Sequence, residues 1–224
     1  MKYKTINIKN GGYLESIEGN PDWYFCKKYN DNFLDLFEAE EIIKSGNKFD
    51  GNNVYLVHYP DGKVFNLFER RENIYIERPV YSKGKIYFLE VDFNKNIMIL
   101  NSFKCDDILS SYDLNSIKKV ETEISLSEIE DCYNLLLEIE PIMIVRCPNN
   151  GTFEIIYPER KTYKIENEES FVFRDYDDMY FSKWVEEPEY KEFIILRDFH
   201  TGEKREVYCG DIFRMPNGEI WKIK

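Results

Sequence analysis

The densest group of polar side chains in the sequence is the run Arg174-Asp175-Tyr176-Asp177-Asp178. Carboxylates at alternating positions, such as Asp175 and Asp177, are ligands that Ca²⁺ or Mg²⁺ prefers. The spaced ligand positions and the central glycine of an EF-hand loop are absent, so the run indicates an ordinary acidic turn. We therefore predict no metal ion and no other cofactor. Because loops on a rigid scaffold usually carry function, we expect Asp175, Tyr176 and Asp178 to contact a ligand.

Aromatic residues offer a second kind of chemistry, the stacking of a sugar or a peptide side chain. The tryptophans fall on or beside equivalent strands of the pattern described below. The simplest interpretation places them in the core between sheets, and the alternative is an aromatic lining shared with nearby tyrosines. That alternative adds Trp23, Tyr55 and Trp184 to the acidic-turn residues, so the predicted ligand-binding residues are Trp23, Tyr55, Asp175, Tyr176, Asp178 and Trp184.

Catalytic signatures are missing from the sequence. His58 and His200 are the only histidines, and no nucleophile or orienting carboxylate stands in a recognisable arrangement beside either of them. No G-x-S-x-G, P-loop, dinucleotide fingerprint or H-E-x-x-H is present. We predict no catalytic residue, although a hydrolase with a pair of carboxylates stays open because two acids distant in sequence can meet across a cleft.

The five cysteines are odd in number and scattered, and none forms a C-x-x-C pair. This pattern argues against a disulfide framework and against a zinc site, and it favours reduced, buried thiols. The acidic run formed by Glu166, Glu168 and Glu169 is expected to be a solvated connection.

The formal net charge of −12 and the isoelectric point of about 4.8 exclude two classes of partner. Phosphate backbones and anionic membranes would be repelled, because the basic pairs, such as Lys27-Lys28 and Arg70-Arg71, are isolated. A basic protein or peptide is the partner that this charge favours. The oligomeric state is not indicated.

The segment MKYKTINIKNGG lacks the apolar core of a signal peptide, and no window approaches the ~20 apolar residues of a membrane span. The sequence therefore predicts a cytoplasmic protein that does not enter the membrane.

Composition indicates a mainly β protein. Aromatic residues make up 16% of the chain, Ala39 is the single alanine, and glutamine is absent, so residues that suit a pleated surface replace two strong helix formers. The stretch Val54 to Phe68 is the recurring unit: two apolar runs joined by Pro60-Asp61-Gly62, which predicts a β-hairpin. Similar hairpins are predicted at Trp23 to Phe37, Ile86 to Phe103, Ile142 to Tyr157, Met179 to Phe199 and Ile212 to Ile223.

A period of roughly thirty to fifty residues with about four strands is typical of radial repetition. The pattern resembles the generic β-propeller blade, as in small bacterial β-propeller-like proteins, but it carries no WD40, kelch or calcium-loop signature. We predict one all-β domain over 1–224, a ring of five or six small antiparallel sheets whose last sheet is closed by the strand at residues 2–9. A β-sandwich, or two small β domains divided near 104–131, is the alternative.

Two segments depart from the repeat. Glu38 to Ser45, followed by Gly46, is interpreted as one or two helical turns with a glycine C-cap, with a strand as the alternative. The segment 104–131 is interpreted as an irregular or helical insertion, with a short helix near 126–131 that begins at Ser125 or Ser127.

These features favour a non-enzymatic binding or scaffolding module whose acidic face recognises a basic protein or peptide. One alternative is a carboxylate-pair hydrolase that acts on carbohydrate. Another is an acidic antitoxin-like inhibitor that neutralises a basic nuclease by charge complementarity.

Overall fold

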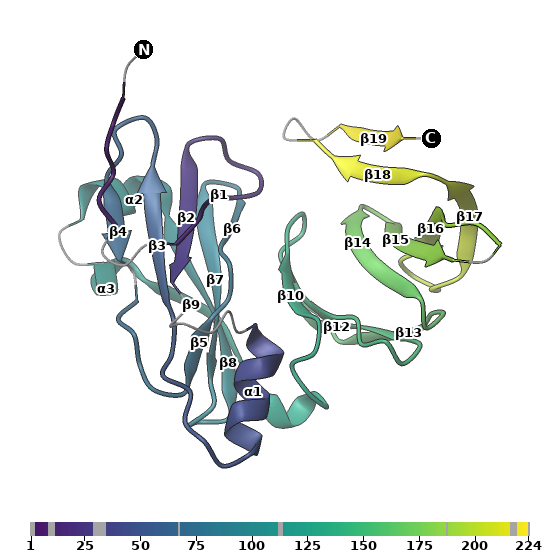
Figure 1. The fold of residues 1–224 in the computed structure, drawn as a ribbon, viewed down its shortest axis with the longest axis horizontal. Coiled ribbons are helices and arrows are strands. Elements are labelled where there is room, and N and C mark those ends of the chain that lie inside the picture. The colour runs from purple at the N-terminus through teal and green to yellow at the C-terminus, as the bar shows by residue number, and fades with distance from the viewer. Residues whose placement is uncertain are drawn as a thin grey trace. The chain divides into compact units, whose positions relative to one another are not determined.

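The computed structural model describes residues 3–8, 12–28, 35–66, 68–111, 114–186, 188–215 and 219–223. The chain divides into two compact units, Met1–Cys132 and Tyr133–Lys224, which we describe one at a time (Figure 1). The prediction of a single domain over 1–224 stays a prediction.

The first sheet of unit 1, sheet A, is an antiparallel meander in chain order. Its centre confirms the predicted Val54 to Phe68 hairpin, since Leu56 pairs with Phe65 and Gly62 takes a φ of 69° in the turn. The expected hairpin from Trp23 to Phe37 is wrong, because Trp23 pairs with His58 instead. Its turn at 30–32 lies outside the described residues. The strands are β1 (Leu14–Ser16), β2 (Trp23–Lys28), β3 (Asn53–His58) and β4 (Val64–Asn66).

A helix follows where the second arm of that hairpin was expected. Helix α1 (Leu36–Lys44) begins with a capping box: the Asp35 carboxylate accepts from the Glu38 backbone N–H, and the Glu38 carboxylate accepts from the Asp35 N–H. The helical interpretation of Glu38 to Ser45 is confirmed, and Gly46 takes a φ of 83° just after the helix.

Sheet B is the second sheet of unit 1. The pair β7–β8 confirms the predicted hairpin from Ile86 to Phe103. Both β5 and β6 pair with β7, at its two ends, so they act as one edge strand interrupted near Pro79. Sheet B is therefore also a meander with four strand positions. Its strands are β5 (Ile74–Ile76), β6 (Val80–Ser82), β7 (Lys85–Asp92), β8 (Ile97–Lys104) and β9 (Lys119–Ser125).

The segment 104–131 is only partly the insertion that the sequence indicated. Two short helices, α2 (Cys105–Ser110) and α3 (Leu114–Ile117), lead into β9, which pairs with β8 and completes sheet B. The expected helix near 126–131 is a single turn, η1 (Leu126–Glu128), where the Ser125 hydroxyl accepts from the Ser127 N–H.

Sheets A and B share one core in unit 1. Apolar side chains of alternating strand positions, such as Trp23 and Leu56 in sheet A and Phe88 in sheet B, belong to a single buried cluster. Face-to-face packing of two small sheets buries the apolar side that each sheet cannot cover alone. Phe88 and Phe103 form a T-shaped contact within this cluster, with 5.7 Å between their ring centroids.

Residues 3–8 do not form the expected closing strand. The Lys4 ammonium donates to the Pro60 carbonyl at 2.9 Å, and a Cβ on Gly62 would collide with Cδ1 of Ile6. This segment therefore runs against the β3–β4 turn of unit 1, and it has no strand pairing. The prediction that residues 2–9 pair with the last sheet is therefore wrong for residues 3–8, the part of this segment that the structure describes.

Unit 2 begins with two further meanders in chain order, sheets C and D. They confirm the hairpins predicted at Ile142 to Tyr157 and Met179 to Phe199. Sheet C contains β10 (Leu135–Glu138), β11 (Met143–Arg146), β12 (Thr152–Tyr157) and β13 (Lys161–Lys164). Sheet D contains β14 (Glu169–Asp175), β15 (Asp178–Val185), β16 (Lys191–Asp198) and β17 (Lys204–Cys209).

Sheet E is the two-stranded hairpin of β18 (Asp211–Arg214) and β19 (Ile220–Ile223), which confirms the strand pair predicted at Ile212 to Ile223. The predicted turn at 216–218 lies outside the described residues.

Sheet D has a separate core on each face. On one face, Phe181 and Ile195 pack with Phe153 and other residues of sheet C. On the other face, Tyr180 and Ile194 belong to a smaller cluster with Ile212 of sheet E. Because side chains alternate along a strand, neighbouring residues of β15 enter different cores.

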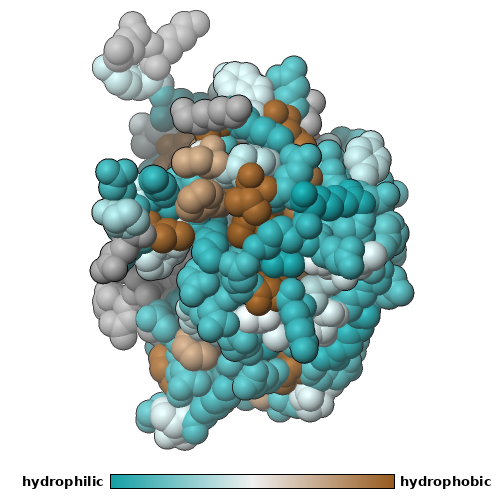
Figure 2. Space-filling view, turned by 90° about the vertical axis from the view of Figure 1, so that its right-hand side faces the viewer, coloured by the Kyte–Doolittle hydropathy of each residue, from teal (hydrophilic) through white to brown (hydrophobic). Residues whose placement is uncertain are grey.

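The all-β prediction is confirmed: the described residues form five small antiparallel sheets, none of them closed into a barrel. The closed ring stays a prediction. No helix within these residues is long and apolar enough to cross a bilayer. Figure 2 shows a face on which hydrophilic residues predominate and hydrophobic side chains gather in small groups.

Candidate functional site

The candidate site of unit 2 is an open hollow of about 210 Å³ where sheet D meets the start of β18. We call it the acidic hollow. A hollow of this size has room for one side chain and is smaller than the roughly 300–1,000 Å³ of pockets that enclose drug-sized ligands. Its lining residues are Ser182, Lys183, Trp184, Glu192, Phe193, Ile194, Gly210 and Asp211.

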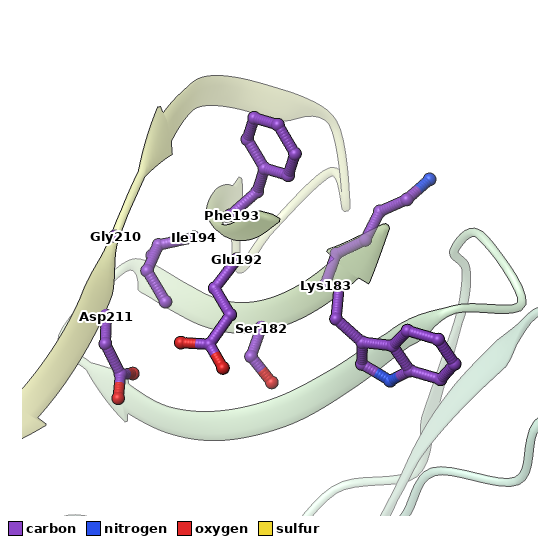
Figure 3. Close-up of a pocket in the computed structure, with 8 residues that line it drawn as sticks. Ser182, Lys183, Glu192, Phe193, Ile194, Gly210 and Asp211 are labelled. Atoms are coloured by element: carbon purple, nitrogen blue, oxygen red, sulfur yellow. The ribbon is translucent and has the colours of Figure 1, made fainter. Parts of the chain in front are cut away.

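Strand register places the functional side chains on one side of sheet D. Trp184 pairs with Glu192 and Ser182 with Ile194, and residues directly opposite each other share a face. Figure 3 shows the side chains of Ser182, Glu192 and Asp211 directed into the hollow. Two carboxylates from different sheets therefore line one hollow together with one hydroxyl.

Lys183 lines the hollow but does not neutralise it. Its ammonium lies 2.5 Å from a Glu166 carboxylate oxygen and 3.5 Å from one of Glu168. In Figure 3 its side chain, like that of Phe193, is directed away from the two carboxylates. The lysine charge is therefore used on the opposite face of sheet D.

The contacts of the two carboxylates within the described residues are neutral. Glu192 accepts from the Tyr190 hydroxyl at 2.6 Å, and Asp211 accepts from the Ile212 backbone N–H at 2.7 Å. No lysine, arginine or histidine of the described residues forms an ion pair with either one. The hydrogen bond to Glu192 raises the pKa of Tyr190, because the phenol donates to a carboxylate and ionising it would place two negative charges together.

Aromatic side chains flank these carboxylates. Trp184 is 53% exposed and Tyr190 is 64% exposed, which leaves both rings accessible from solvent. Carboxylates with an accessible indole form the kind of site that attracts a cation, by charge-assisted hydrogen bonds and by the ring quadrupole. The arrangement can therefore hold an ammonium or a guanidinium group.

The acidic turn at the other end of β15 has a different character. Arg205 bridges the carboxylates of Asp178, at 2.6 Å, and Asp198. Asp177 lies 3.0 Å from His200 Nε2. Most of these acids already have a cationic or titratable neighbour, whereas Tyr176 beside them is 84% exposed and has a φ of 50°.

The predicted ligand-binding residues therefore fall into three places. Asp175, Tyr176 and Asp178 lie at this turn, and Trp184 lies at the acidic hollow. Trp23 and Tyr55 belong to unit 1, where Trp23 is only 2% exposed and packs 4.9 Å from the His58 ring. Trp23 thus follows the core interpretation, and Trp184, with its exposed ring, does not.

The expectation that Glu166, Glu168 and Glu169 are solvated holds for Glu166 and Glu168, which are exposed, and is wrong for Glu169. Glu169 is 1% exposed, and Arg197 donates to both of its carboxylate oxygens at 2.8 Å. Cys147 of unit 2 is buried, and burial raises the pKa of its thiol. Within the described ranges, no three His, Cys, Asp or Glu side chains are grouped as metal ligands.

Sequence reasoning missed Glu192 and Asp211. One signal could have identified Glu192: in the predicted hairpin it lies directly opposite Trp184, on the same face of the sheet. Asp211 carried no such signal, because its approach to Glu192 depends on how sheet E packs on sheet D.

The chain has few detectable similarities to known proteins. No protein-family model matches it, and the search of curated proteins found no match. One similar solved structure comes from a structural and mechanistic analysis of two prolyl endopeptidases, with 12% identity and a TM-score of 0.48. The match covers 93% of this chain and 30% of that one, and similarity at this level does not identify a family.

Proposed function

We propose that this protein is a non-enzymatic binding module that recognises a basic protein or peptide by accepting a lysine or arginine side chain in the acidic hollow. The observation that carries the proposal is the pair of carboxylates, Glu192 and Asp211, which meet beside the accessible indole of Trp184 without an ion-pair partner among the described residues.

Electrostatics support this proposal. Hydrogen bonds to a charged group each contribute about 1.5–3 kcal/mol, and a cation over an exposed indole adds about 0.5–1 kcal/mol. Because the chain carries a net charge of −12, the long-range field also draws a basic ligand toward the protein.

The size of the hollow favours binding of one side chain over the hydrolysis of carbohydrate. A glycosidase must enclose a sugar ring between its two acids and hold the flanking ring as well. A hollow of about 210 Å³ accommodates a lysine or arginine side chain, and it is open to solvent on one side.

A direct test uses the tripeptide Ac-Gly-Lys-Gly-NH₂ titrated into the protein and followed by amide and indole NMR shifts. We expect shifts at the Trp184 indole and at Gly210 and Asp211, and none with Ac-Gly-Glu-Gly-NH₂. Glu192→Gln with Asp211→Asn should weaken binding about tenfold or more, because two charge-assisted contacts become neutral ones.

The matched control removes two negative charges elsewhere on sheet D. Glu203 and Glu206 are exposed acids near or on β17, so Glu203→Gln with Glu206→Gln changes the net charge equally and leaves the hollow intact. This control should keep the affinity within about twofold of the wild type, as distant surface charges are screened by salt. If both double variants weakened peptide binding equally, the proposal that the acidic hollow is the binding site would be wrong.

A further inference from the structure

The outer face of sheet E is an exposed apolar surface. Phe213, Trp221 and Ile223 are 44%, 53% and 55% exposed. Phe213 pairs with Trp221, so their rings share one side of the hairpin, and Ile223 follows on that side two residues further along β19. We call this set of three residues the outer apolar face.

Packing of sheet E on sheet D does not explain why these three side chains are apolar. Ile212, between Asp211 and Phe213, is 2% exposed and packs in the cluster on sheet D. On the same inner side, Arg214 lies over the Phe173 ring at 4.7 Å and Lys222 over the Tyr208 ring at 4.2 Å. The inner side therefore anchors the hairpin, and the outer apolar face has no corresponding role in the core.

The outer apolar face continues from the acidic hollow. Asp211 lines the hollow, lies on the same side of β18 as Phe213, and pairs with Ile223. Residues two apart in a strand are separated by about 6.6 Å, and this is also the spacing of alternate residues in an extended peptide. Asp211 and Phe213 can therefore contact two alternate side chains of such a peptide.

We propose that the acidic hollow and the outer apolar face form one site for an extended peptide that has a lysine or arginine and, two residues away, a large apolar residue. This inference rests on the proposed function and names its ligand class. The cationic side chain enters the hollow, and the apolar side chain covers Phe213 and Trp221.

Charge complementarity selects this occupant over a second copy of the chain. Acids border the outer apolar face on both sides: Asp211 at the hollow, and Glu219, which accepts from the Trp221 indole N–H at 3.0 Å. A second copy would bring its own Asp211 carboxylate and a net charge of −12 to the same place, whereas a basic peptide neutralises Asp211.

The experiment compares two pentapeptides, Ac-Gly-Lys-Gly-Phe-Gly-NH₂ and Ac-Gly-Lys-Gly-Ala-Gly-NH₂, by NMR titration. We expect the phenylalanine peptide to bind about tenfold more tightly, because its ring loses contact with water on the aromatic pair. In the variant Phe213→Ser with Trp221→Ser, the two peptides should bind equally and with the affinity that the alanine peptide shows for the wild type.

The outcomes separate this inference from the proposed function. Equal binding of both peptides to the wild type overturns the inference and leaves the proposed function standing. Binding of neither peptide overturns both. If sedimentation shows a dimer that the Phe213→Ser, Trp221→Ser variant dissociates, and the peptides do not differ, a second copy is the occupant and the peptide inference is wrong.

Discussion

The two faces of sheet D use the same kinds of residue in opposite ways. On the face toward sheet C, Arg197 and Lys183 bind Glu169 and Glu166. On the face toward sheet E, Glu192 lies in an open hollow without such a partner among the described residues. Lys183 and Trp184 are neighbours in sequence and belong to different faces, because the strand period is two.

This difference separates carboxylates that stabilise the fold from those available to a ligand. The Glu169 side chain is 0% exposed, so its charge needs Arg197 in the folded protein. A carboxylate in an open hollow keeps its hydration and can exchange water for a cation. The proposed function depends on that contrast, and the three predictions below test it in order of expected effect.

The largest effect is expected from Arg197→Met, which leaves Glu169 buried without its main cation. We expect a loss of about 3–5 kcal/mol in the free energy of unfolding, measured by urea denaturation, because an unpaired buried charge is costly. The double variant Arg197→Met with Glu169→Met should recover most of the loss. A single variant as stable as the wild type would show that Glu169 is solvated in solution.

A smaller, pH-dependent effect is expected from Glu166. Hydrogen bonds from Lys183 and Lys204 lower the pKa of Glu166 from 4.5 to about 2. Because the folded-state pKa lies below the unfolded value, this contribution is present above about pH 5 and is lost as the pH falls toward 2.

The urea midpoint measured between pH 6 and pH 2 gives the test of that linkage. Glu166→Gln removes the titrating group, so its midpoint should fall less steeply between pH 5 and pH 2 than that of the wild type. Glu203→Gln serves as the control, since it removes an exposed acid with no ion pair among the described residues. Parallel profiles of wild type and Glu166→Gln would contradict the prediction.

The smallest effect on stability is expected in the acidic hollow. Glu192→Gln with Asp211→Asn should change the free energy of unfolding by no more than about 0.5 kcal/mol, as substitutions at open surface positions usually do. The same variant is expected to lose binding of the lysine tripeptide. A large loss of stability would mean that these carboxylates hold sheet E in place.

Hairpins were the part of the fold that sequence reasoning predicted well. The pairings of β3 with β4 and of β7 with β8 follow from local patterns, a polar turn between two apolar runs. The failures involved non-local choices. Trp23 pairs with His58, although a nearer partner was predicted, and β9 joined sheet B from a segment interpreted as an insertion.

The candidate site was predicted in one residue only, the exposed Trp184. Trp23 looked equivalent in sequence, yet it is buried in unit 1 against His58 and Phe65. Both tryptophans occupy strands, and the strand pattern alone does not say which face another sheet will cover. Packing of the neighbouring sheets made one ring a core residue and left the other accessible.

The sequence by itself determined the β class, the turns of the confirmed hairpins, and which residues of each strand share a face, because these follow from backbone geometry over a few residues. Only the tertiary structure decided that Asp211 meets Glu192, since this requires Ile212 to anchor sheet E on sheet D. It also decided which acids find a cation, because the pairing of Glu169 with Arg197 joins β14 to β16 across the intervening strand β15. Contacts of that kind depend on the sum of many packing interactions, and no short pattern in the chain encodes them.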